Sequence, residues 1–71
     1  MAAPQPAKVK ERATLSRADV AARLRELAEQ ISQGQLSFAQ GTVFVAEQMA
    51  FELEFEREHG KSELTIELEW R

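Results

Sequence analysis

The sequence contains no cysteine and no tyrosine, and it has only one histidine among 71 residues. The lack of cysteine excludes a disulfide framework and a thiolate metal site. A nucleophile–base–acid set would have to use His59, which we place in an exposed turn beside Gly60. The three glycines stand too far apart to form a phosphate-binding loop. These absences predict a protein that is not an enzyme, with no catalytic residue, no metal ligand and no cofactor.

Long apolar runs are also missing, so no segment is expected to cross a membrane and no signal-peptide core is expected near the N-terminus. At 71 residues the chain has room for one small domain. From these absences we expect a soluble, cytoplasmic protein.

Charge is unevenly distributed along the chain, although the formal net charge is only −3. Residues 1–31 have six cations against four acids, whereas residues 47–71 have eight glutamates against three cations. Such asymmetry indicates the chemistry of partners rather than the fold.

One amphipathic helix is predicted over residues 17 to about 33. Ser16 is its expected N-cap, because its hydroxyl can accept from the Asp19 amide, and Gly34 is the expected C-terminal cap residue. Apolar residues then recur at helical spacing from Val20 to Ile31. Residues 1–13, with two prolines and no periodicity, are predicted to be a disordered tail, which leaves 14–71 as the folded domain.

Four strands should follow the helix. Leu36 and Phe38 begin the first pair, Ala39-Gln40-Gly41 is the expected three-residue loop, and Val43 and Val45 continue it. A second turn is expected near Glu47-Gln48.

The last two strands form the clearest pattern in the chain, FELEFEREHGKSELTIELEW. Strict alternation places apolar groups on one face of a hairpin and carboxylates on the other. An even-numbered loop sets Phe55 opposite Leu64 and makes Glu58 and Lys61 flank the turn, where Gly60 supplies the positive φ. The same register sets Glu52 opposite Glu67 and Glu56 opposite Glu63, which is unfavourable for like charges.

Together these elements predict an α+β fold in which the N-terminal helix packs on a four-stranded antiparallel β-meander. The expected core consists of Val20, Leu24, Leu27, Ile31, Leu36, Phe38, Val43, Val45, Phe51, Leu53, Phe55, Leu64, Ile66, Leu68 and Trp70. Trp70 is expected to close one end of this core against Met49 and the helix. Phe44 has the wrong parity for the core, which leaves a homodimer open as an alternative to a monomer.

The capped helix SRADVAARLRELAEQI, the two glycines Gly34 and Gly41, and the terminal strand Glu63 to Trp70 resemble the amphi-Trp domain family. That family is named for an amphipathic C-terminal strand that ends in tryptophan, and the resemblance covers about residues 14–71. The family often has a proline-containing turn between its second and third strands, where this chain has Ala46-Glu47-Gln48. The resemblance implies fold and size, and it carries no established activity.

Function is predicted only by class. We expect a small non-enzymatic interaction or structural module that binds a protein through an acidic sheet face or a strand edge, with a basic protein as one candidate partner. The candidate partner-binding residues are Glu52, Glu54, Glu56, Glu63, Glu67, Glu69 and Phe44. One alternative is divalent-cation binding by the same carboxylates. Another is nucleic-acid binding by a basic N-terminal strip, which the acidic sheet disfavours. The strip consists of Lys8, Lys10, Arg12, Arg17, Arg23 and Arg25. A solubilising role of the acidic face stays open beside them.

Overall fold

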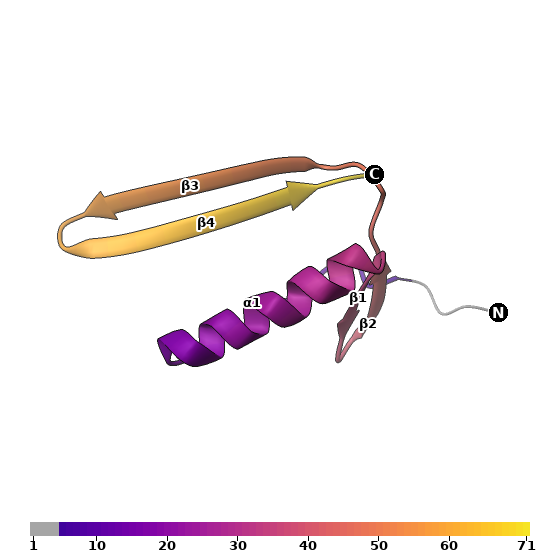
Figure 1. Cartoon of the computed structure of the whole chain (residues 1–71), viewed down its shortest axis with the longest axis horizontal. Helices are drawn as coiled ribbons and strands as arrows, with labels where there is room; N and C mark the ends of the chain where they lie inside the picture. The colour runs from indigo at the N-terminus through magenta and orange to yellow at the C-terminus, as the bar shows by residue number, and fades with distance from the viewer. Residues whose placement is uncertain (1–4) are drawn as a thin grey trace.

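The structure of the protein is a computed structural model, which describes residues 5–71. It consists of the helix α1 (Arg17–Ser32) and the strands β1 (Gln35–Phe38), β2 (Gly41–Phe44), β3 (Ala50–Glu58) and β4 (Lys61–Glu69). All pairing is antiparallel: β1 pairs with β2, and β3 pairs with β4 (Figure 1). The α+β class is therefore confirmed.

The helix begins and ends where its capping residues predict. The Asp19 amide donates to the Ser16 hydroxyl at 3.1 Å, which satisfies one of the free N–H groups of the first turn. At the other end Gly34 has a φ of +84° and its amide donates to the Ile31 carbonyl at 3.0 Å. A left-handed residue of this kind suits glycine, so the chain turns sharply out of α1 and into β1.

The short hairpin β1–β2 is tied to the helix and to the segment before it. The Ser37 amide donates to the Gln30 side chain at 2.8 Å, on the outer side of β1. The Phe44 amide donates to the Gln5 side chain at 3.0 Å, on the outer side of β2. The outer edges of both short strands are thus partly satisfied within the chain.

The long hairpin β3–β4 has the predicted register. Phe55 lies opposite Leu64, Leu53 opposite Ile66 and Glu58 opposite Lys61. Its turn is the two-residue loop His59-Gly60, in which both residues have positive φ, 52° and 76°. This is the conformation of the primed turns that match the twist of paired strands.

Two details of the predicted sheet are wrong. The four strands form two separate two-stranded sheets, and no four-stranded meander exists within residues 5–71. The loop of the short hairpin has two residues, Ala39 and Gln40, because Gly41 already pairs with Phe38. The physical reason for the split is the connector: after Val45, whose amide donates to the Gly34 carbonyl, the chain bends at Glu47 and Gln48 and leaves β2 before β3 starts.

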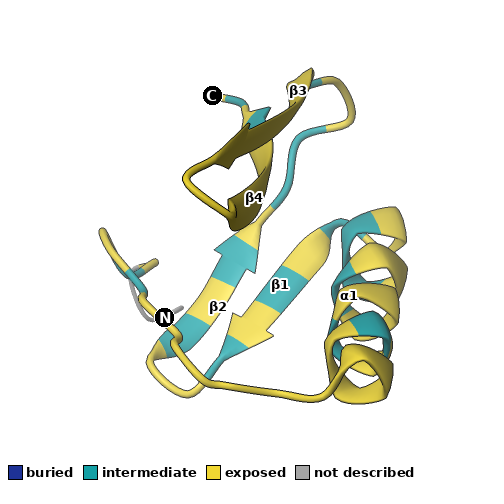
Figure 2. Ribbon diagram, turned by 90° about the vertical axis from the view of Figure 1, so that its left-hand side faces the viewer, coloured by how far each residue is buried: buried dark blue, intermediate teal, exposed yellow. Residues whose placement is uncertain are grey.

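The predicted core is also wrong, because no residue of the described chain is fully buried. Half-buried residues gather on α1, β1, β2 and the connector, whereas β3 is exposed along its whole length (Figure 2). The radius of gyration is 14.3 Å, against about 11 Å for a compact chain of this length. The helix lies against β1, and the long hairpin runs beside α1 without its backbone closing onto it.

Candidate interaction surfaces of the long hairpin

The two faces of the β3–β4 hairpin carry different kinds of side chain. One, here called the apolar face, carries Phe51, Leu53, Phe55, Leu64, Ile66 and Leu68. The other, here called the acidic face, carries Glu52, Glu54, Glu56, Glu63, Glu67 and Glu69. The pairing register places each group on its predicted face, because side chains alternate along paired strands.

The acidic face holds carboxylates close together without compensation from cations. Glu52 is the cross-strand partner of Glu67, and Glu56 is the partner of Glu63. All six glutamates are exposed to water. Among the described residues, none of the six forms an ion pair with a lysine, an arginine or a histidine. Lys61 lies on the same side at the turn end without an ion pair to these glutamates. Along the rest of the face, water and any external cation offset the mutual repulsion of the carboxylates.

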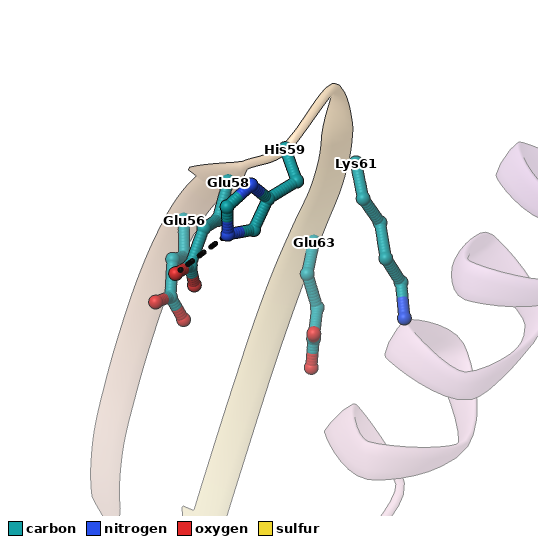
Figure 3. A pocket seen from close by; sticks show the side chains of 5 residues that line it. All are labelled: Glu56, Glu58, His59, Lys61 and Glu63. Carbon is teal, nitrogen blue, oxygen red and sulfur yellow. Dashed lines mark ion pairs between the residues drawn. The ribbon is translucent and has the colours of Figure 1, made fainter.

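A shallow hollow of about 380 Å³ lies at the turn end of this hairpin (Figure 3). Glu56 and Glu58 enter it from β3, Lys61 and Glu63 from β4, and His59 from the turn. The His59 ring lies 3.5 Å from a Glu58 oxygen, and 90% of its side chain is exposed. Within residues 5–71 no three acidic or histidine side chains converge closely enough to hold a metal ion. The hollow is thus an open part of the acidic face rather than an enclosed site.

The apolar face opens onto a groove that it shares with the helix. The groove has a volume of about 520 Å³. The helix contributes Leu24, Leu27, Ala28 and Ile31 to its lining. The base of the hairpin contributes Met49, Phe51, Ile66 and Leu68. Both walls are apolar, so water in this groove contacts a surface that it solvates poorly.

Toward the turn, the apolar face has no cover at all. Phe55 is 65% exposed and Leu64 is 59% exposed. In Figure 1 this end of the hairpin projects past the start of α1 along the long axis of the molecule. Apolar surface that is exposed over several neighbouring residues is a common feature of interaction sites.

Comparison with known proteins assigns the family. The model of the Amphi-Trp domain matches residues 3–71. The chain belongs to the Amphi-Trp domain family. No curated protein and no solved structure matches it. The family match begins further toward the N-terminus than the predicted boundary at residue 14, and it takes in Gln5, which bonds to β2.

The tryptophan at the end of the amphipathic strand has a defined role in this Amphi-Trp domain. Trp70 is half-buried, and its indole Nε1 donates to the Phe44 carbonyl at 3.0 Å. This hydrogen bond joins the end of β4 to the end of β2. Trp70 thus links the two hairpins, a contact that strand parity alone does not predict.

Phe44 lies at this junction and away from the apolar groove. Its side chain is 54% exposed and shares a small hollow with Gln5 and Trp70. Its outward parity is as predicted, because β2 alternates between half-buried and exposed residues.

Residues ahead of the helix also take part in the structure, which the sequence reasoning missed. Glu11 forms a two-pronged ion pair with Arg23, with N–O distances of 2.9 and 2.8 Å. The hydrogen bonds from Arg23 lower the pKa of Glu11, and the same contact raises the pKa of Arg23. Residues 5–13 have no helix or strand, and residues 1–4 of the predicted tail lie outside the described residues. Glu11 and Arg23 belong to no common periodic pattern, so the sequence gives no signal that could have revealed this pair.

The basic strip predicted near the N-terminus is partly occupied by these contacts. Arg23 also lies 3.4 Å from Glu26, so one of the strip's cations already has two carboxylate neighbours.

The helix α1 has 16 residues and is neither long nor apolar enough to cross a bilayer, and no other helix occurs in the part of the chain described.

Proposed function

We propose that this Amphi-Trp domain is a non-enzymatic protein-binding module that captures a basic protein segment on its acidic face. One observation carries the proposal: six exposed glutamates share one face of a regular two-stranded ribbon and have no cation partner within residues 5–71. A partner that supplies lysine or arginine side chains relieves the repulsion between Glu52 and Glu67 and between Glu56 and Glu63.

The geometry of the face suits an extended or flat partner rather than a small molecule. The strands β3 and β4 are each nine residues long, so the ribbon extends about 30 Å. The carboxylates project from a surface without an enclosing loop, which is the arrangement for many weak, salt-dependent contacts. Divalent cations favour sites where ligands wrap the ion, and the described residues contain no such group.

The test compares two double variants that lose the same charge. Glu52→Gln with Glu67→Gln removes one facing pair from the acidic face. Glu29→Gln with Glu47→Gln removes two exposed carboxylates elsewhere. Each variant and the wild type would be used to capture proteins from a native extract at low and high salt.

A partner held by the wild type and by the second variant, but lost with the first variant, supports the acidic face as the binding surface. Equal capture by all three proteins would contradict the proposal. So would capture that does not weaken at high salt, because exposed ion pairs are screened.

A further inference from the structure

We infer that the apolar face of the β3–β4 hairpin is covered by a second copy of this chain. The two copies pack about a two-fold axis, with the turn end of one hairpin, here called its tip, against the opposite end of the other hairpin, here called its base. This inference concerns the apolar face, and it stands or falls independently of the acidic face and its partner. The chain exposes more surface than a folded protein of its size, no residue among 5–71 is buried, and the carboxylates all lie on the face opposite the apolar one.

The surface area gives the first argument. The chain exposes 6703 Å², whereas a folded monomer of 8.0 kDa exposes about 4,450 Å². The excess is about 2,250 Å² per chain, or about 4,500 Å² for two copies, which falls within the range of obligate homodimers.

Part of this excess belongs to residues 1–13, ahead of the helix. Counting all of these residues as extended chain of about 1.4 kDa removes about 2,000 Å². About 800 Å² per chain then remains above the expectation for the rest of the protein, which equals the area that each partner buries in a standard interface. This smaller excess still matches the area of a standard interface.

The distribution of charge favours a second copy of the chain as the partner that covers the apolar face. The apolar face meets a copy of itself without bringing glutamates together, because all six point to the opposite face. Edge-to-edge pairing of two β4 strands would instead place the Glu63 and Glu67 rows of two copies side by side, which like charges disfavour. Face-to-face packing also leaves both acidic faces in water.

The single charge on the apolar side of the hairpin sets the orientation. Arg57 lies beside the turn, opposite Ser62. In a tip-to-base arrangement the two Arg57 side chains lie at opposite ends of the interface, whereas a tip-to-tip arrangement would bring them together.

The shapes of the tip and the base also favour this orientation. In the dimer, the exposed side chains of Phe55 and Leu64 at the tip of one copy lie over the groove of the other copy. That groove has a volume of about 520 Å³ and is lined by the helix and the hairpin base. A two-fold axis makes the contact reciprocal, so both tips and both grooves are covered at once.

The experiment measures mass by light scattering for the wild type and three variants. The wild type is expected at twice its 8.0 kDa chain mass. Leu64→Glu adds a carboxylate to the apolar face, and Thr65→Glu adds one at the next residue, on the acidic face. We expect Leu64→Glu to weaken the dimer by about 30-fold or more, and Thr65→Glu to leave it intact. Phe44→Ser, which alters an exposed aromatic residue outside the groove, is also expected to leave the dimer intact.

A second measurement covers the case in which Leu64→Glu does not fold. The melting temperature of the wild type should rise with protein concentration, since dissociation accompanies unfolding of a dimer. A wild type at the monomer mass with a concentration-independent melting temperature would overturn the inference. Loss of the dimer in Thr65→Glu or Phe44→Ser, with Leu64→Glu still dimeric, would overturn it as well.

Discussion

The two hairpins of this protein are built by the same rules and end in different surroundings. The short hairpin β1–β2 is held by side-chain bonds from Gln30 and Gln5, and its inward residues are half-buried. The long hairpin β3–β4 has more than twice the paired length, yet only Leu68 among its residues is half-buried. Regular pairing therefore fixes register and turn, but burial depends on what lies against the face.

The link between the two hairpins is the place where a single change should have the largest effect. Trp70→Ala removes both the half-buried ring and the hydrogen bond to the Phe44 carbonyl. We expect a loss of about 2–3 kcal/mol in unfolding free energy, below the range for fully buried tryptophan because the ring is partly exposed. Trp70→Phe keeps a ring and loses only the donor, so it should cost about 1 kcal/mol. Urea unfolding measures both losses, and a Trp70→Phe variant as stable as the wild type would contradict the role of the hydrogen bond.

Glycine substitutions should affect the region of one hairpin at a time. Gly60 has a φ of +76°, and a Cβ there would meet no atom within 4 Å. Gly60→Ala should thus cost about 1 kcal/mol through backbone strain alone. The loss should be confined to the β3–β4 amides in hydrogen exchange. Gly34→Ala, at a φ of +84° beside Val45, should instead loosen the end of α1 and the start of β1. Identical exchange patterns in the two variants would contradict this division.

The acidic face offers a smaller and opposite effect. Glu52→Gln with Glu67→Gln removes a like-charge cross-strand pair, so the unfolding free energy should rise by a few tenths of a kcal/mol at low salt. The gain should shrink as salt is added. Glu47→Gln, which removes an exposed carboxylate from the connector, is the control and should show no comparable gain. A stabilisation that is unchanged in high salt would mean that charge repulsion is not its cause.

The smallest expected effect concerns the segment ahead of the helix. Arg23 lowers the pKa of Glu11 in the folded protein, so the pair stabilises the fold at neutral pH. That contribution is lost as the pH falls through the lowered pKa and the carboxylate is protonated. The melting temperature of Glu11→Gln should therefore be slightly below that of the wild type at pH 7, and the two should converge as the pH falls below the lowered pKa of Glu11. A gap that persists in acid would show that Glu11 acts by packing and not by charge.

Local rules predicted the elements of this fold well. Ser16, Gly34 and the His59-Gly60 turn act over a few residues. The strict alternation of β3 and β4 excludes odd-numbered loops, because only an even-numbered loop keeps each face uniform. The same rules did not predict the assembly of the elements. Whether β2 pairs with β3 depends on the path of the connector at Glu47 and Gln48, which no alternation describes.

The predicted core failed for a related reason. The alternation of Phe51, Leu53 and Phe55 shows that one face of the hairpin is apolar, but it does not show what covers that face. The prediction assumed that the helix of the same chain covers it. The contact of Trp70 with Phe44 and the ion pair of Glu11 with Arg23 are long-range and involve single residues, so periodicity gives no sign of them. The candidate residues of the acidic face, by contrast, follow from alternation and do lie together.

The arrangement of two copies is the central claim, and a distance between labels tests it most directly. Because the chain has no cysteine, Lys61→Cys creates a single labelling position beside the turn, on the acidic side and away from the apolar face. In a tip-to-base dimer, spin labels on the two copies should lie about 30–40 Å apart, roughly one hairpin length plus the label arms. A distance under about 15 Å would place the tips together, and the absence of any dipolar coupling would mean that no second copy covers the apolar face.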